Sequence, residues 1–269
     1  MMRGVLDFFK SMYVVTIALT LALSAIASYN SRVFPAGLAI AVAACCILDL
    51  LAMKLLVKKG IKFPYSGCIS GIIIGSLAPI DAPIAAILTG ALVAVVSKYL
   101  VKLRGHHVFN PATFGLLVSL SVFRQGDMWW AASPTWNLPG IIVPLSLFLV
   151  IANHKADKLM VSLPFLGVVG VLYFTTGTIE FSGFSSLAVL ISSLPYYFAF
   201  IMLSEPKTSP NRPKEQIVFG IAIALTYTAL EFSDVTFPFF IALLAGNLAY
   251  ALCRNGLFSN KQAPAKAPQ

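Results

Sequence analysis

Charged residues are scarce in this chain of 269 residues. Asp, Glu, Lys and Arg make up 11% of the sequence, whereas 58% of the residues are hydrophobic. Soluble domains carry about 25% charged residues, so this chain lacks the polar surface that a soluble protein of its length needs. The composition argues against a separate soluble domain and predicts an all-α, polytopic membrane protein that lies in the lipid bilayer.

Motifs for nucleotides, metals and redox clusters are also missing. The chain has no Walker loop, no GxGxxG and no HExxH, so we expect it alone to bind neither ATP nor a nicotinamide, and no metal site is predicted. Cys45, Cys46, Cys68 and Cys253 lie in or beside apolar runs without CxxC spacing, which favours buried small side chains over a disulfide or cluster. The net charge of +9 does not indicate nucleic-acid binding, because the basic residues lie in short loops beside apolar runs.

Long hydrophobic runs, in contrast, fill the chain. Several can cross a hydrocarbon core of about 30 Å at about 1.5 Å per residue. The third and fifth runs are short, which is typical of half-helices buried among other helices. The first has no decisive cleavage pattern, so we expect a retained span and not a signal peptide. The ten predicted segments cover residues 12–30, 33–57, 66–80, 82–103, 109–123, 138–153, 159–176, 184–204, 215–231 and 235–253.

The distribution of Lys and Arg predicts the orientation of these segments. With ten spans and a cytoplasmic N-terminus, 17 of the 19 basic residues fall on the inside, and only Arg32 and Arg124 fall outside. We therefore predict a multi-pass protein of the cell's inner membrane with both termini in the cytoplasm. Trp129, Trp130 and Trp136 lie in one outer loop, where we expect them to anchor the protein at the membrane interface.

An internal repeat is suggested by matching prolines. At an offset of 127, SLAPIDAP at 76–83 aligns with LSEPKTSP at 203–210, and FNPATFGLL at 109–117 aligns with TFPFFIALL at 236–244. Because each half would hold five spans, an odd number, the halves would be inverted in the membrane. We predict two inverted five-helix repeats with broken helices: residues 1–137, residues 138–258, and a disordered cytoplasmic tail at 259–269.

The most interrupted stretch is IMLSEPKTSPNRPKEQIVFG at 201–220, where three prolines prevent a continuous helix. We expect Ser209 or Asn211 to cap the outgoing helix, with Pro210 in its first turn. Exposed N–H groups at that helix start, beside Lys and Arg, would form an anion site. We also expect this break to meet the break at 79–83 across the pseudo-two-fold axis.

A second candidate site opens the fifth segment. Asn110 followed by Pro111 predicts a capped helix start, whose positive end could bind a phosphate or a polarised ring oxygen. His106 and His107 precede it and are interpreted as markers of the water interface. On the third segment, the row of glycines at 67, 71 and 75 predicts close packing against another helix.

Acidic residues at membrane depth usually mark an ion path or pair with a cation. Asp81 and Glu205 lie in the two breaks, on opposite predicted sides, and could bracket such a path. Asp49 lies within the second segment. It is a third candidate for the ion path, although its spacing from Lys54 also allows a structural pair.

Two stretches resemble a known family. FNPATFGLLVSL at 109–120 and FIMLSEPKTSPNRPKEQIVFG at 200–220 resemble the family of membrane subunits that is common to the Rnf electron-transport complex and the sodium-pumping NADH:quinone reductase. In that family an F-N-P-A helix start is followed by a D/E-P-x-T-x-P break and a helix that opens with Phe-Gly. The resemblance covers about residues 66–253 with matching order and spacing.

The resemblance implies a flavin-binding membrane subunit of a redox-driven, ion-translocating electron-transport complex. It implies FMN or riboflavin as cofactor, and other membrane and peripheral subunits as partners, with no catalytic residue identified in this chain. Family members often hold FMN through a threonine in an S/T-G-A-T sequence. The corresponding loop at 123–140 contains Asp127 and Thr135 but no such sequence, and SGFSS at 182–186 lies in another loop, so we expect non-covalent binding. The candidate cofactor-binding residues are Asn110, Pro111, Ala112, Thr113, Lys207, Thr208, Ser209 and Arg212.

Two other functions stay open at this point. Urea-channel-type proteins also have two inverted five-helix halves, so a channel or transporter of a small solute, including a flavin, is an alternative. A purely structural scaffold subunit is a third. Purification separates the first two, because a flavoprotein is yellow and fluorescent whereas a transporter is colourless and moves solute in liposomes.

Overall fold

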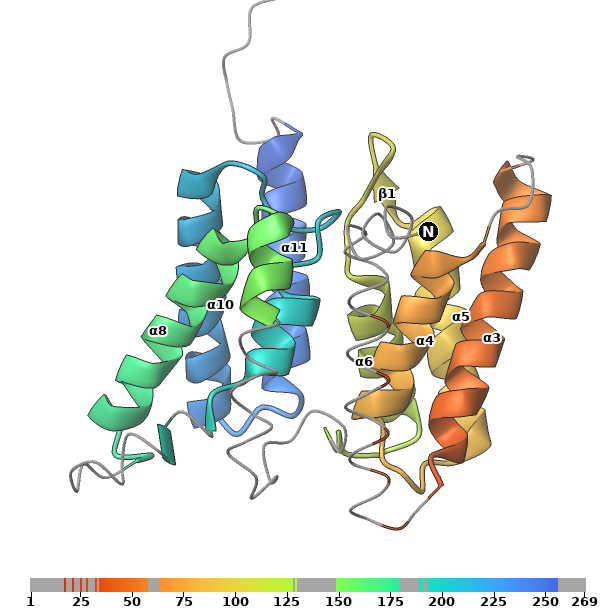
Figure 1. Cartoon of the computed structure of the whole chain (residues 1–269), viewed down its shortest axis with the longest axis horizontal. Helices are drawn as coiled ribbons and strands as arrows, with labels where there is room; N and C mark the ends of the chain where they lie inside the picture. Colours follow the sequence, from red (N-terminus) through yellow and green to blue (C-terminus); the bar gives the residue numbers. More distant parts are fainter. Residues whose placement is uncertain are drawn as a thin grey trace, which may run out of the picture.

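The computed structural model describes residues 34–57, 63–127, 129, 149–179, 189–190 and 193–255, and single positions at 17, 21, 25, 28 and 32. The protein is mostly helical, with 73% of residues in helices. In the described residues, the helices form two bundles that stand side by side (Figure 1). The predicted helical class is confirmed.

The first bundle contains the helices of the N-terminal half. Helix α3 is followed directly by a short π-helical stretch, η1, and packs against both α4 and α5, while α5 also packs against α6. The bounds are α3 Ala36–Ala52, η1 Met53–Val57, α4 Tyr65–Leu77, α5 Ile84–Leu100 and α6 Pro111–Val122.

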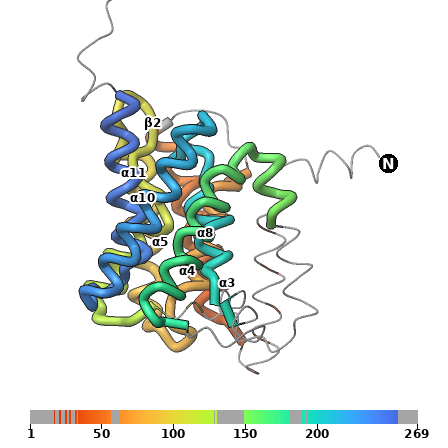
Figure 2. The backbone as a smooth tube through the Cα atoms, turned by 90° about the vertical axis from the view of Figure 1, so that its left-hand side faces the viewer, coloured from red at the N-terminus to blue at the C-terminus, as the bar shows by residue number. Residues whose placement is uncertain are grey.

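The second bundle contains the helices of the C-terminal half. Helix α8 packs against α10 and against η2, a π-helical turn, and α10 packs against α11. Contact between α6 and α11 joins the two bundles, and all the helices stand roughly upright in the side view (Figure 2). The bounds are α8 Leu159–Thr175, η2 Phe198–Met202, α10 Pro213–Phe232 and α11 Pro238–Arg254.

The helices agree with the predicted segments in position, and they differ at particular ends. Helices α4 and α6 have 13 and 12 residues, so they are about 20 and 18 Å long, which confirms that the third and fifth segments are short. The fourth segment was expected to be helical to residue 103, but α5 ends at Leu100. An antiparallel hairpin follows, β1 Lys102–Leu103 with β2 His106–His107, turned by the positive φ of Arg104 and Gly105.

Among the described residues, two helices are both long and apolar enough to cross a membrane, judged by length and composition. These are Ala36–Leu56, which joins α3 to most of η1, and Pro213–Phe232. Five shorter apolar helices of 10 to 17 residues accompany them. The first predicted segment and the predicted tail at 259–269 lie outside the described residues, apart from single positions in the former.

Close packing of α3 on α4 depends on the predicted row of glycines. A Cβ atom added to Gly71 would lie 2.5 Å from the Cα of Val42, and one added to Gly75 would lie 2.4 Å from the Cα of Leu38. These contacts are with backbone atoms, which cannot move aside as a flexible side chain can. The prediction that this row allows a helix backbone to approach closely is therefore confirmed.

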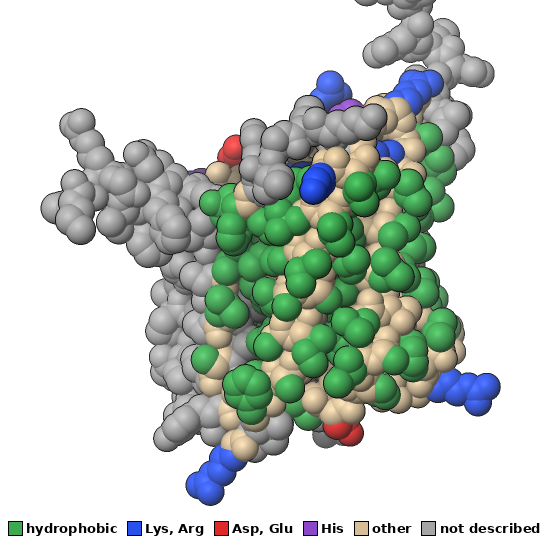
Figure 3. Space-filling view, turned by 90° about the vertical axis from the view of Figure 1, so that its right-hand side faces the viewer, with side chains coloured by type: hydrophobic (Ala, Val, Ile, Leu, Met, Phe, Trp, Pro, Cys, Tyr) green, Lys and Arg blue, Asp and Glu red, His purple; other side chains and the backbone are tan. Residues whose placement is uncertain are grey.

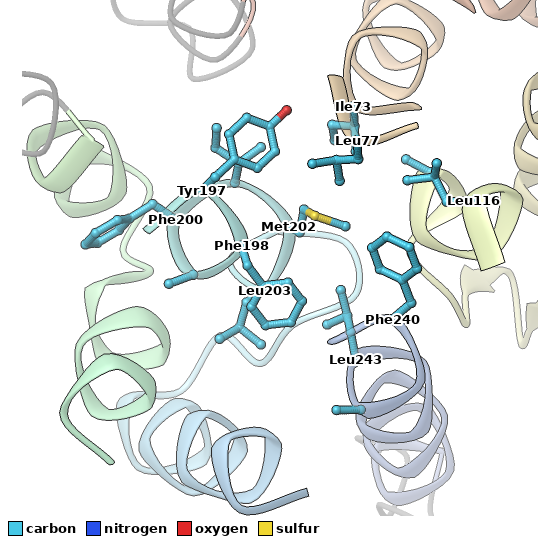
Figure 4. Close-up of a cluster of buried hydrophobic side chains, with 14 of the residues drawn as sticks. Ile73, Leu77, Leu116, Tyr197, Phe198, Phe200, Met202, Leu203, Phe240 and Leu243 are labelled. Atoms are coloured by element: carbon cyan, nitrogen blue, oxygen red, sulfur yellow. The ribbon is translucent and has the colours of Figure 1, made fainter. Parts of the chain in front are cut away.

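Apolar side chains fill the centre, where the two bundles meet (Figure 4). Leu77 of α4, Leu116 of α6, Met202 of η2 and Phe240 of α11 point toward one another and are buried. The centre is therefore a packed core in the described part of the chain.

Candidate functional site

A pocket of about 50 Å³ opens at one end of the bundle, where α4 and α6 begin. We call this the pocket end. The third wall of the pocket is the segment 203–212 between η2 and α10, which we call the inner break. The residues that line the pocket are Ser66, Ile69, Ser70, Ile73, Asn110, Pro111, Ala112, Ile201, Glu205, Pro206 and Lys207.

The start of α6 is built as the sequence predicts. Asn110 is the N-cap, its side-chain oxygen accepts the N–H of Thr113 at 3.0 Å, and Pro111 occupies the first turn. The Nδ2 of Asn110 donates to the carbonyl of Met202 at 3.3 Å. One side chain thus caps α6 and also ties it to the inner break.

Proline explains why the inner break needs such bonds. In a helix, each N–H bonds the carbonyl four residues earlier, so Pro206, which has no N–H, cannot bond the carbonyl of Met202. The N–H of Glu205 reaches that carbonyl at 3.4 Å, and the side chain of Asn110 supplies a second donor. The carbonyl of Ser209, which precedes the start of α10, accepts the ammonium of Lys158 at 3.3 Å. Side chains from distant segments thus supply donors to the carbonyls of this segment.

Asn247, in the middle of α11, connects the two parts of the site. Its Oδ1 accepts the backbone N–H of Asn110 at 3.0 Å, and its Nδ2 donates to the carbonyl of Thr208 at 3.2 Å. The side chain is 1% exposed. Sequence reasoning missed this residue, although an amide inside an otherwise apolar helix was a signal that could have identified it.

Glu205 and Lys207 bring charge to the pocket. The carboxyl of Glu205 accepts a hydrogen bond from the hydroxyl of Thr208 at 3.1 Å. Burial raises the pKa of Glu205 to about 7, against the opposing effects of Thr208, Lys207 and Lys98. The same positive surroundings act on His107, whose pKa is lowered to about 4, mainly by burial and then by Lys207 and other lysines.

Several donors at the pocket have no partner. Within the described residues, no hydrogen bond engages the hydroxyls of Ser66 and Ser70 or the ammonium of Lys207. Ser70 is 7% exposed, Ser66 is half-buried and Lys207 is exposed. Donors that no protein group engages are suited to a polar ligand or to ordered water.

The predicted cofactor-binding residues separate into three positions. Asn110, Pro111, Ala112 and Lys207 line the pocket. Thr113, Thr208 and Ser209 are buried next to these residues in sequence but do not line it. Arg212 is exposed and pairs with Glu215 at 3.5 Å, away from the pocket lining.

The predicted cap of the helix after the inner break was wrong. The N-cap of α10 is Arg212 and its first residue is Pro213, with no side-chain cap. Ser209 and Asn211 serve the break instead, where the hydroxyl of Ser209 donates to the carbonyl of Glu205 at 2.7 Å and Asn211 accepts from Lys158 at 2.9 Å.

Asp49 has a different partner from the one its spacing predicts. Its carboxylate accepts from Lys98 at 2.6 Å, from the hydroxyl of Tyr99 at 2.7 Å and from the N–H of Gly67 at 3.1 Å. Lys54 is exposed instead. The carboxylate is thus held by α4 and α5 in a buried, fully engaged arrangement, which is typical of a structural ion pair and not of an ion path.

The two breaks do not meet, so that prediction was also wrong. The inner break lies beside Ser66 at the start of α4, whereas residues 79–83 follow the end of α4, about 18 Å away along the helix. Asp81 is exposed there. The reason is geometric, because the two breaks lie at opposite ends of α4. Apolar side chains, and not a polar path, occupy the described centre between Asp81 and Glu205.

Trp129 does not lie on an exposed rim. Its ring packs against those of Tyr197, Phe198, Phe239 and Phe240, with ring centroids 5.3 to 6.4 Å apart. The indole N–H donates to Asp127. The expected interface anchors Trp130 and Trp136, the candidate flavin acceptor Thr135 and the SGFSS sequence at 182–186 lie outside the described residues.

Comparison with known proteins finds neither a family model nor a curated protein that matches this chain.

A flavin can be tested against this geometry. The positive start of α6, the free hydroxyls and the Lys207 ammonium suit a phosphate or another polar end of the cofactor. The volume of about 50 Å³ holds a few groups of the size of water and does not enclose a three-ring isoalloxazine. The described pocket therefore fits one end of a flavin and not its ring system.

Proposed function

We propose that the protein spans the membrane. The outward face of α5 supports this, because exposed apolar residues follow one another every four positions, from Ile84, 59% exposed, to Leu100, 68% exposed. This stripe is about 24 Å long, and soluble monomers rarely expose a continuous apolar surface of that extent. Figure 3 shows apolar side chains covering this side of the molecule, with Lys and Arg at its ends.

We also propose ten spans in two inverted repeats. The packing supports this, because several pairs of neighbours recur in the two halves. Helix α3 contacts α4 and α5, and α8 likewise contacts η2 and α10. Helix α5 contacts α6, and α10 likewise contacts α11, while α6 meets α11 at the proposed axis. The 127-residue offset pairs the same segments. The proposed repeats are residues 1–137 and 138–258.

We propose that the protein lies in the inner membrane of the cell and that the pocket end faces the cytoplasm. Lys98, Lys158, Lys207 and Arg212 all lie at this end, near the inner break. Arg124 follows the last residue of α6 at the opposite end. This asymmetry supports the orientation with positive residues inside.

We infer that the protein is the membrane subunit of a redox-driven, ion-translocating electron-transport complex and holds a non-covalent flavin. It would thus be similar to the membrane subunits common to the Rnf complex and the sodium-pumping quinone reductase. One observation carries this proposal. The two stretches that bear the family resemblance, which are 92 residues apart at Asn110 and Met202, contact each other and form one pocket. A bound flavin would supply electron transfer, while Lys207 and the start of α6 would hold its polar end.

A channel or transporter has less support. A conducting path needs polar groups or water through the bundle, whereas Ile73, Leu77, Leu116 and Met202 close the described centre. Polar groups gather instead at one end. This distribution favours a bound group near one membrane surface over a solute path.

The test is the absorbance of the purified protein. The full chain, purified in mild detergent, should be yellow, and its flavin should be released by denaturation in about equal molar amount to the protein. Denaturing gels should show no fluorescent band, because the flavin is not covalent. A colourless protein that binds neither added FMN nor added riboflavin would refute the proposal.

Variants of the pocket locate the flavin. Asn110→Ala and Glu205→Gln should lower the flavin content while leaving the helical circular-dichroism spectrum unchanged, because both side chains line the pocket. Asp81→Asn, at the opposite end, is the matched control and should keep its flavin. If all three variants retain equal flavin, the cofactor lies elsewhere in the chain.

A further inference from the structure

Lys158 is an unusual residue in this protein, because its side chain is 2% exposed and has no carboxylate within ion-pair distance among the described residues. Lysine is almost never fully buried unless it is paired. It lies just before α8, at the pocket end of the second bundle. The sequence predicted it only as one of the cytoplasmic basic residues.

Three neutral oxygens of the inner break surround its ammonium. The Nζ atom lies 3.3 Å from the carbonyl oxygen of Ser209, 2.6 Å from that of Pro210 and 2.9 Å from the side-chain oxygen of Asn211. A protonated lysine has three N–H donors and no acceptor. The number of donors therefore equals the number of oxygens, and each oxygen is on the inner break.

Gln216 of α10 supports the same segment. Its Nε2 donates to the carbonyls of Asp157 at 2.7 Å and Pro210 at 3.2 Å. The start of α10 and the chain before α8 are thus tied to each other and to the inner break. No water is needed to satisfy these carbonyls, which is important for a segment at the edge of a membrane.

The inner break transmits this anchoring to the pocket. The N–H of Ser209 donates to the carbonyl of Glu205 at 3.0 Å, and its hydroxyl donates to the same oxygen at 2.7 Å. Glu205 and Lys207 form the charged wall of the pocket. Lys158 therefore connects to that wall through Ser209.

We propose that Lys158 is a positioning residue, whose protonated side chain holds the inner break so that Glu205 and Lys207 face the pocket. The inference rests on the proposed function only in taking this pocket as the ligand site. A neutral amine has two N–H donors, so one of the three oxygens would lose its lysine donor and face a lone pair. The wall should then become mobile while the helices remain folded.

The charge state of Lys158 is accessible to experiment. Burial lowers the pKa of Lys158 to about 8, and Asp157 opposes this shift. The other charged groups beside it, Arg212 and Glu215 of α10, pair with each other at the surface, and Gln216 is neutral. At pH 9 about ten neutral amines should be present for each ammonium.

A rise in pH should loosen the wall, but it should not weaken the fold as a whole. Because the pKa is lower in the folded chain than the ordinary value of 10.5, the unfolded chain binds more protons between pH 8 and 10.5. The contribution of Lys158 to the free energy of unfolding therefore increases over this pH interval. Loosening of the wall and loss of the fold are thus distinguishable.

The experiment measures the mobility of the wall directly. The four native cysteines are replaced by serine, Lys207→Cys is labelled with a nitroxide, and electron paramagnetic resonance spectra are recorded from pH 6.5 to 9.5 in detergent. With Lys158 present, the spectrum should sharpen with a midpoint at about pH 8, while the melting temperature does not fall. Lys158→Met should give the sharp spectrum at every pH.

The control is Lys155→Met, which removes an exposed lysine from the same segment and should reproduce the parent titration. If Lys158→Met does not fold, the pH titration of the labelled protein that keeps Lys158, which we call the parent, still tests the proposal. A parent spectrum that is independent of pH, or a Lys158→Met spectrum as broad as the parent's at pH 6.5, would overturn the proposal. The label reports mobility with or without a flavin. If the unsubstituted chain is colourless and the labelled variant gives the expected titration, the flavin is refuted and this role of Lys158 is kept.

Discussion

Replacement of Asn247 by leucine tests the link between the inner break and α6. Leucine is branched at the same carbon as asparagine and is larger, so Asn247→Leu removes two hydrogen bonds without leaving a cavity. It leaves the N–H of Asn110 and the carbonyl of Thr208 buried without those partners. Each unsatisfied buried group costs about 1–3 kcal/mol, so the variant should be less stable by about 2–6 kcal/mol.

Asn255→Leu at the end of the same helix is the matched control. Asn255 is also buried, but its amide donates to Ala251 at 2.6 Å, within the last turn of α11, and joins no other element among the described residues. Its replacement should cost about 1 kcal/mol. Both variants are purified in mild detergent, and unfolding by increasing sodium dodecyl sulfate is followed by circular dichroism.

The difference between the two variants is the decisive quantity. The expected costs differ by about 1–5 kcal/mol, and a difference of 1.4 kcal/mol already changes the folded-to-unfolded ratio about tenfold. Equal unfolding curves for Asn247→Leu and Asn255→Leu would show that the bridge contributes nothing to stability. The inner break would then not depend on α11.

Three further outcomes are expected. Gly71→Val should destabilise the fold by about 3 kcal/mol or more, because its Cβ would meet the Cα of Val42 at 2.5 Å, whereas Gly167→Val, with nothing within 4 Å, should be nearly neutral in thermal melts. The pKa of Glu205 is raised from 4.5 to about 7, so the folded chain binds more protons than the unfolded chain between these values. The free energy of unfolding should therefore fall by up to about 3 kcal/mol as the pH rises from 4.5 through 7. Glu205→Gln should remove this part of the pH dependence of unfolding. Exposed Cys253 should react with an impermeant maleimide in inside-out vesicles and not in intact cells, and the reverse result would invert the proposed topology.

Local features of the site could be predicted from the sequence because proline and asparagine act on their own neighbours. The cap of α6 by Asn110 depends on residues within one turn. The partners of the freed carbonyls could not be predicted in this way. Lys158 bonds residues 51 and 52 positions away, and Asn247 bonds Thr208 at a separation of 39. Such pairs depend on how the two bundles pack.

Tertiary contacts also override helical spacing. Asp49 and Lys54 are five residues apart on one helical run, but Asp49 is buried against α4 and α5 whereas Lys54 is exposed. A buried carboxylate needs a partner that is also inside, and Lys98, 49 residues away, provides it. The short third and fifth segments and the glycine row can be read from the spacing of residues along the chain, so the sequence predicts them better than it predicts ion pairs.

The polar groups at the pocket end divide into two sets with different tasks. Asn247 and Lys158 use their donors on backbone oxygens of the inner break, so a change in either should first disturb the position of that segment. Ser70 and Lys207 line the pocket and hold no backbone group among the described residues. Because unpaired buried backbone groups are costly, the first set cannot turn toward a ligand without leaving them unpaired. A ligand at this site must therefore be recognised mainly by the second set, whose replacement should reduce binding with little effect on the fold.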